Sequence, residues 1–263
     1  MDLGLKDKVI MVAAASKGLG FGIAQAAARE GARVSIGSRT ERDIMWAARN
    51  LQAETGVPAL GAVMDVTDNE SILEWTAATL THFGRIDGLV VNAGGPPAGN
   101  FDDFDDMDWQ AAFELTLLSS ARMIRAVLPA MREQGGGAIL TITSSSIKEP
   151  IDILLLSNVM RSGVVSLVKS LSRQLAPERI RVNNLVPGRI DTDRVRALDK
   201  LTAEKRGVTP EEQKAAQEAL IPWGRYGAIE EFGKAGAFLL SDAASYITGE
   251  TLVVDGGSMR TVW

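Results

Sequence analysis

The sequence predicts a doubly wound α/β fold, in which a seven-stranded parallel sheet carries helices on both faces. Short apolar runs rich in β-branched residues recur along the 263 residues, and longer Ala- and Leu-rich stretches separate them. Strands that alternate with helices pair in parallel through right-handed crossovers. The runs also lack the polar alternation of a sheet with one wet face, which favours a sheet covered on both faces.

The strands are predicted where β-branched runs are bounded by Gly, Asn, Asp or Pro. The first run contains Val9-Ile10-Met11-Val12, four apolar residues in succession, which suits a buried central strand. The predicted strands lie at 9–15, 33–38, 59–65, 88–92, 138–144, 181–186 and 251–255.

Helices are predicted between the strands, where apolar residues recur at three- and four-residue spacings. They lie at about 20–32, 40–55, 69–83, 106–134, 155–176 and 229–241. Segment 189–227 breaks the alternation, because it is charged and helix-prone and contains Pro210 and Pro222. It is either a substrate lid or a solvated helical excursion. We interpret 1–263 as one domain that carries this excursion.

Composition favours a small-molecule partner. The net charge is −5, and the basic residues are spread along the chain, so nothing attracts a nucleic acid or an anionic membrane. The chain has no cysteine and one histidine, so we predict neither a disulfide nor a metal site. Its start lacks the basic-then-apolar order of a signal peptide, and no apolar run reaches the roughly 18 residues of a membrane span, so we expect a cytoplasmic protein.

A glycine-rich turn between the first strand and the first helix is a candidate phosphate site. Glycines let backbone N–H groups approach a pyrophosphate, and the start of a helix adds a partial positive charge. The candidate residues are Ala14, Ser16, Lys17, Gly18, Leu19 and Gly20.

The turn and four further motifs resemble the short-chain dehydrogenase/reductase family, whose fold is Rossmann-like. Ala14 stands where the first glycine of the family's G-x-x-x-G-x-G loop is expected. The other matches cover the chain from about 8 to 258, in order and at family spacing. They are Asn92-Ala93-Gly94, Asp65-Val66 at the adenine, Pro187-Gly188 with Ile190 and Thr192 at the nicotinamide carboxamide, and Tyr246 to Gly249 with Val254 to Gly257.

The residues after the second strand indicate NADP(H) as the cofactor that the resemblance implies. An acidic residue there would accept from a free ribose hydroxyl and repel a 2′-phosphate. This chain has Ser38 and Arg39 instead. Arg39 can pair bidentately with the phosphate, and Lys17 can reach the same group. In the alternative interpretation Arg39 stacks on adenine and Lys17 is solvated.

The family's proton-donating site is altered. The resemblance implies a Ser after the fifth strand, which is Ser144, then a Tyr 13 residues later and a Lys four beyond it. Those two positions hold Ser157 and Arg161, and Thr116 aligns best with the family's helix Asn. The two tyrosines, Tyr226 and Tyr246, lie in family-like segments elsewhere. An alkyl hydroxyl does not titrate in reach of neutral pH, and an arginine keeps its charge, so neither replaces the phenol.

Three functions remain open for this site. The first is a carbonyl reductase in which Arg161 and Ser144 stabilise an oxyanion while water or another acid supplies the proton. The second is a reductase of conjugated double bonds. The third is a non-catalytic protein that binds NADP(H) or a partner. The nearest replacement acids are Lys148, Glu149 and Asp152, which otherwise are ordinary loop charges.

The resemblance also bears on substrate and assembly. Relatives commonly reduce 3-oxoacyl thioesters, sugars or steroids, and we favour a 3-oxoacyl-type carbonyl because that activity is common among bacterial relatives of this size. Family members pair through the helices that correspond to 106–134 and 155–176, which implies a homotetramer. The small residues Ser162, Gly163 and Ser166 favour close approach of the second helix. His82 is interpreted as a residue at a helix end and not as a catalyst.

Overall fold

The computed structural model describes residues 2–262, and over these residues it contains one parallel sheet of seven strands in the order β3-β2-β1-β4-β5-β6-β7. The predicted strands are confirmed. The order reverses direction between β1 and β4, which makes their carboxyl ends the topological switch point of the sheet. The strands are β1 Val9–Ala13, β2 Arg33–Ser38, β3 Ala59–Val63, β4 Gly88–Val91, β5 Gly137–Ile142, β6 Ile180–Pro187 and β7 Thr251–Val254.

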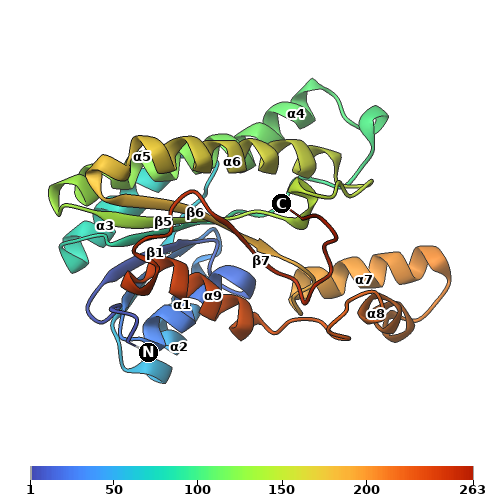
Figure 1. Ribbon diagram of the computed structural model, residues 1–263, viewed down its shortest axis with the longest axis horizontal. Helices are drawn as coiled ribbons and strands as arrows, with labels where there is room; N and C mark the ends of the chain where they lie inside the picture. Colours follow the sequence, from blue (N-terminus) through green and yellow to red (C-terminus); the bar gives the residue numbers. More distant parts are fainter. Residues whose placement is uncertain (1, 263) are drawn as a thin grey trace.

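Helices cover both faces of the sheet, as predicted (Figure 1). One apolar core lies between the sheet and α1, α2 and α9, and a second lies between the sheet and α3, α5 and α6. Successive residues of β1 divide between the two cores, because neighbouring side chains of a strand point to opposite faces. These helices are α1 Gly18–Arg29, α2 Glu41–Thr55, α3 Asn69–Phe83, α5 Ser119–Glu133, α6 Leu155–Gln174 and α9 Ile229–Leu240.

The predicted helix at 106–134 is not one regular helix. It begins as α4 (Asp106–Ala112), passes through a π-helical segment at Phe113–Leu118 and continues as α5. The π-helical segment packs against α6: a Cβ added at Gly163 would lie 2.9 Å from Leu117. Such widened turns occur mostly at functional sites, and no apolar spacing distinguishes them from an α-helix in the sequence.

Segment 189–227 contains two helices, α7 (Asp193–Arg206) and α8 (Pro210–Glu218), which project from one end of the sheet (Figure 1). A single bridge between Ile190 and Gly227 closes the base of the segment. Thr192 caps α7, and Thr209 caps α8 with Glu212 in a reciprocal capping box. Across the part of the chain that the structure describes, no helix has the length and apolarity that crossing a membrane demands.

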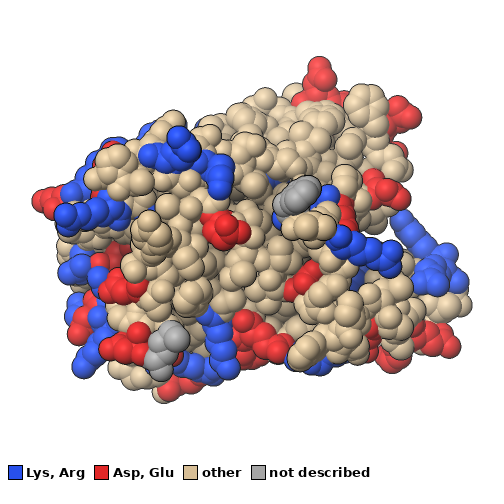
Figure 2. Space-filling model, viewed as in Figure 1, with Lys and Arg blue, Asp and Glu red and all other residues tan. Residues whose placement is uncertain are grey.

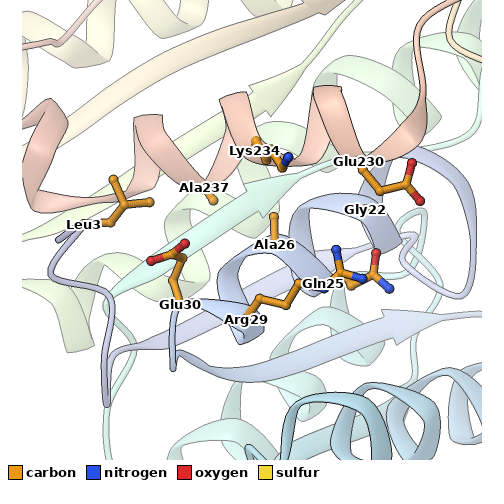
Figure 3. Close-up of a pocket in the computed structure, with 9 residues that line it drawn as sticks. All are labelled: Leu3, Gly22, Gln25, Ala26, Arg29, Glu30, Glu230, Lys234 and Ala237. Atoms are coloured by element: carbon orange, nitrogen blue, oxygen red, sulfur yellow. The ribbon is translucent and has the colours of Figure 1, made fainter. Parts of the chain in front are cut away.

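Glycines bring α1 and α9 into backbone contact beneath the sheet. A Cβ at Gly233 of α9 would overlap the carbonyl group of Gly22 in α1, and a Cβ at Gly236 would overlap the side chain of Ile23. Figure 3 shows the shallow groove outside this crossing, with Ala26 and Ala237 between charged side chains. The crossing holds α1 in place, and α1 begins at the glycine-rich turn.

We therefore expect Gly233→Ala to lower the free energy of unfolding by about 2 kcal/mol or more, because neither backbone can move away from the added methyl group. Gly236→Ala is the matched control. It gains the same helix propensity, but its methyl group meets side-chain atoms of Ile23 and no backbone atom, so the loss should be smaller. Urea denaturation of both variants measures the difference, and equal losses would contradict the backbone contact.

Candidate active site

The glycine-rich turn lies at the carboxyl end of β1 and is shaped for a close-approaching ligand. Ala14 has φ +49° and Gly18 has φ +66°, both in the left-handed region. β1 consequently ends at Ala13, two residues earlier than predicted. A Cβ at Gly20 would lie 2.9 Å from the Ala14 carbonyl oxygen, so a side chain there would push the helix off the strand.

The first turn of α1 is open to an anion. Its N-cap residue, Lys17, makes no side-chain cap hydrogen bond, and the first turn holds no acidic residue. The amide N–H groups at such a helix start need a partner from outside the helix. Ala14, at the position where the family's glycine is expected, adopts a left-handed conformation that is unfavourable for a residue with a Cβ.

Ser38 is the last residue of β2, and Arg39 follows it directly. The Ser38 hydroxyl oxygen is buried and has no hydrogen-bond partner among the described residues. Arg39 follows it and is exposed, without an ion pair to a described residue. An unpartnered buried hydroxyl beside an unpaired guanidinium suits a phosphate-bearing ligand.

The other candidate cofactor residues lie at the same edge. The Asn92 amide donates to the Ala14 carbonyl oxygen over 3.3 Å, which ties the end of β4 to the turn. Nothing lies within 4 Å of a Cβ at Gly94, so this backbone faces open space. Asp65 accepts hydrogen bonds from Thr67, while Val66 is buried. The remaining residues of this set lie at the end of β6 and just after it. Pro187 is the last residue of the strand, and Gly188 packs on Asp255. Ile190 is buried, and the Thr192 side chain caps α7.

Arg161, at the position where the sequence predicts an altered catalytic site, lies on α6. Its side chain is 9% exposed. Its Nε donates to the Ser157 hydroxyl oxygen over 3.2 Å, and its Nη1 donates to the Ile142 carbonyl oxygen over 3.0 Å, at the end of β5. The one-turn spacing on α6 thus makes Ser157 a support for the guanidinium.

Burial lowers the pKa of Arg161 to about 10, with a further contribution from the charge of Arg194. A base whose pKa falls to about 10 is still protonated at pH 7, so the site holds a fixed cation. Because the folded protein releases this proton before the unfolded chain would, the charge is lost only as the pH rises through about 10.

Two of the candidate catalytic positions carry hydroxyl groups. Ser144 stands two residues after β5, and its hydroxyl oxygen accepts from the Ser146 amide over 3.2 Å. Thr116 is buried in the π-helical segment, and its hydroxyl has no hydrogen-bond partner among the described residues. A buried hydroxyl without a partner is rare and marks a place for water or ligand.

The candidate replacement acids lie in the loop between β5 and α6. Lys148 is half-buried, whereas Glu149 and Asp152 are exposed. Glu149 accepts from the Arg260 amide over 2.8 Å, which turns it toward the C-terminal segment. His82 lies in the last turn of α3 with its ring edge-on to Phe83, before the amino end of β4 and so away from the carboxyl edge.

The two tyrosines do not replace the missing phenol. Tyr246 is fully exposed. Tyr226 is buried, and its hydroxyl donates to Asp199 over 2.8 Å and accepts from Arg189 over 3.2 Å. Burial, with the hydrogen bond to Asp199, raises the pKa of Tyr226 to about 12. It therefore holds α7 to the end of β6 and is a poor acid near pH 7.

The first turn of α7 contributes two residues that the sequence motifs do not include. Asp193 pairs with Lys17 over 3.2 Å, which joins α7 to the glycine-rich turn. Lys17 therefore pairs with a residue of α7 in this structure, whereas Arg39 has no ion pair to a described residue. Arg194 lies against Gly95, beyond the end of β4. Both follow Thr192 directly, but only the packing of α7 brings them to the site.

The sheet order, the open glycine-rich turn and the edge residues define a Rossmann-like, doubly wound α/β protein. The comparisons give its family. Residues 13–259 match the family described as enoyl-(acyl carrier protein) reductase. Dehydrogenase/reductase SDR family member 4 of Oryctolagus cuniculus is 36% identical over 255 residues, which cover 97% of this chain and 94% of that protein. The chain belongs to the short-chain dehydrogenase/reductase family of oxidoreductases.

Two further proteins are similar over nearly the whole chain. The 3-oxoacyl-[acyl-carrier-protein] reductase FabG of Salmonella typhimurium is 35% identical over 257 residues, which cover 97% of this chain and 98% of that one. L-sorbose reductase from Gluconobacter frateurii, solved with NADPH and L-sorbose, has a TM-score of 0.95 at 30% identity, with full coverage of both chains.

The left-handed conformation of Ala14 gives a prediction. Ala14→Gly should raise the free energy of unfolding by about 0.5–1 kcal/mol, because removing the Cβ relieves more strain than the added freedom of the unfolded chain costs. Ala15→Gly is the control, since Ala15 is buried and has no positive φ; it should lower stability. Urea denaturation that finds Ala14→Gly no more stable than the wild type would contradict strain at this turn.

Proposed function

We propose that the protein is an NADP(H)-dependent reductase of a carbonyl substrate, and that Arg161 stabilises the oxyanion in place of a tyrosine. The single observation that carries this proposal is the buried, fixed cation at the carboxyl end of β5, where the family's catalytic residues lie. A reaction that develops negative charge on an oxygen is accelerated by such a preorganised cation.

The fit of the cofactor rests on this chain's own residues. The open start of α1 would hold the pyrophosphate, and Ser38 with Arg39 would hold the 2′-phosphate. The L-sorbose reductase of similar structure was solved with NADPH. Bound there, NADPH supplies the hydride that adds to the carbonyl carbon of the substrate.

In this proposal the protein provides a positive charge, held in place by hydrogen bonds, and no acidic side chain. Arg161 faces the developing oxyanion with its remaining N–H groups, while Ser157 and the Ile142 carbonyl fix its direction. Ser144 offers a hydroxyl hydrogen bond to the same oxygen. Water supplies the proton to that oxygen, so a carbonyl compound, NADPH and one proton give an alcohol and NADP⁺. The similarity to the FabG reductase favours a 3-oxoacyl-type carbonyl.

A second candidate, reduction of a conjugated double bond, is favoured by the lack of a phenol beside Arg161 in the described chain. Hydride addition to the β-carbon places negative charge on the carbonyl oxygen, where a cation suffices, and water then protonates the α-carbon. The matched family is described as an enoyl reductase, which agrees with this chemistry.

We also propose that 189–227 acts as a lid, because it rises from the carboxyl edge and contacts the glycine-rich turn through the pair of Asp193 and Lys17. Closure of such a segment would keep water from the hydride.

Cofactor choice is tested through Arg39. NADPH should bind at least about tenfold more tightly than NADH, and Arg39→Ala should remove most of that preference, because the phosphate loses its guanidinium partner. Calorimetric titration with both cofactors measures it. Arg42→Ala, which removes an exposed arginine three residues on, is the control and should leave the preference intact.

The oxyanion proposal is tested through α6. Arg161→Met should lower kcat/KM by about 100-fold or more, on the order of 3 kcal/mol, as for the loss of one oxyanion donor. Ser157→Ala should cost less than about tenfold, because the Ile142 carbonyl still holds the guanidinium. NADPH consumption over a panel of ketones and enones gives the rates.

Two outcomes of that screen would change the proposal, and one further variant tests the rest of the site. Turnover that is unaffected by Arg161→Met would exclude Arg161 as the group that stabilises the oxyanion, and Lys148 would be the next residue to test. A wild type that binds NADPH but reduces nothing in the panel would favour a non-catalytic cofactor-binding protein. The double variant Ser157→Tyr with Arg161→Lys should raise carbonyl reduction if the rest of the site is competent.

A homotetramer is proposed from the family's pairing through α5 and α6. Ser162 and Ser166 lie exposed on α6, and Gly163 is half-buried beside the π-helical segment. Exposed small residues permit a second helix to approach closely. Light scattering at micromolar concentration should give four times the mass of one chain, and a monomer would refute this assembly.

A further inference from the structure

Arg161 is buried without a counter-charge. Its two hydrogen-bond acceptors, the Ser157 hydroxyl and the Ile142 carbonyl, are neutral. No Asp or Glu among residues 2–262 lies within 4.0 Å of its nitrogens. Buried charges in proteins are nearly always paired, because an isolated one keeps the cost of its lost hydration. The site therefore lacks a negative charge.

Arg194 is a second arginine at this edge of the sheet; it is exposed and has no ion pair to a described residue. It comes from the first turn of α7 and lies so close to Gly95 that any side chain at that position would displace it. Gly95 follows β4 and Ile142 ends β5, which are neighbouring strands. Both residues therefore lie at the carboxyl edge of the sheet, and the charge of Arg194 contributes, after burial, to the lowered pKa of Arg161.

Other arginines of the same region are paired. Arg189 pairs with Asp199 over 2.7 Å, Arg196 with Asp191 over 2.6 Å, and Arg225 with Glu231 over 2.7 Å. These three arginines therefore have carboxylate partners, whereas neither Arg194 nor Arg161 has one within the described residues. In the face drawn in Figure 2, Lys and Arg side chains also lie beside the notch above the α7–α8 segment.

We propose that Arg194, at the same edge of the sheet as Arg161, binds a carboxylate group of the substrate, so that the protein reduces oxo acids in preference to the same ketones without the charge. This inference rests on the proposed reductase function and specifies its substrate class. The planar fork of an arginine matches a carboxylate through two parallel hydrogen bonds. Arg161 remains free for the oxygen that receives charge, so the two cations take different parts of one substrate.

The reaction balances without a further reagent. The hydride of NADPH adds to the keto carbon, the carbon–oxygen π bond breaks, and water protonates the resulting oxyanion. The carboxylate is unchanged. An oxo acid, NADPH and one proton therefore give a hydroxy acid and NADP⁺.

Matched substrates test the proposal. Acetoacetate and 2-oxobutyrate are compared with their methyl esters, which keep the ketone and remove the charge, by following NADPH consumption. We expect kcat/KM to be at least about tenfold higher for the acids, and Arg194→Gln to abolish that advantage mainly by raising KM. Arg49→Gln, which removes an exposed arginine on α2, should change neither value. Esters that react as well as acids would overturn the proposal and leave the reductase function standing.

A binding measurement separates this proposal from the reductase function itself. Malonate is titrated into the NADP⁺-loaded protein by calorimetry, with wild type, Arg194→Gln and Arg49→Gln. Binding that is lost only in Arg194→Gln supports the carboxylate site even if no substrate is turned over, which would count against the reductase function alone. Absence of malonate binding overturns the site. So does an Arg194→Gln variant whose NADP⁺ affinity falls tenfold while malonate affinity is unchanged, since Arg194 would then serve the cofactor.

Discussion

A buried guanidinium that has lost most of its hydration needs rigidly held acceptors. Among the described residues Arg161 has two, and both are uncharged. One is a hydroxyl group of its own helix and the other is the last carbonyl of β5. The cation is therefore positioned by the distance between α6 and the sheet, and small shifts of the helix would move it. Tight packing of Leu117 on Gly163, where the π-helical segment meets α6, limits such shifts.

The glycine-rich turn, which is the other part of the candidate site, is positioned by the helices on the opposite face of the sheet. Gly22 and Gly233 place α1 and α9 in backbone contact, and α1 fixes the turn that contains Ala14 and Gly18. The glycine-rich turn is joined to the end of β4 by the Asn92 side chain, at the topological switch point of the sheet.

Much of this arrangement could be predicted from the sequence, because strand and helix periodicities are local properties. The four-residue spacing of Ser157 and Arg161 placed both on one face of a helix. Three features escaped prediction. The left-handed turn at Ala14 is dictated by the ligand-facing loop and not by alanine itself, and the π-helical segment has the same apolar pattern as an α-helix. Arg194 reaches Gly95 only because α7 folds back over the sheet edge, which depends on packing between distant segments.

The pair of Lys17 and Asp193, which joins α7 to the glycine-rich turn, is largely solvent-exposed. Exposed ion pairs contribute at most about 1 kcal/mol and are screened by salt. The pair therefore adds little to the hold of segment 189–227 on the turn, whereas Tyr226, Asp199 and Arg189 hold α7 to the end of β6. In the proposed reductase, the negative charges of the bound molecules would bridge Lys17, Arg194 and Arg161 and add to that hold. Departure of the product would then weaken the contact between α7 and the turn, and the spent cofactor would leave after it.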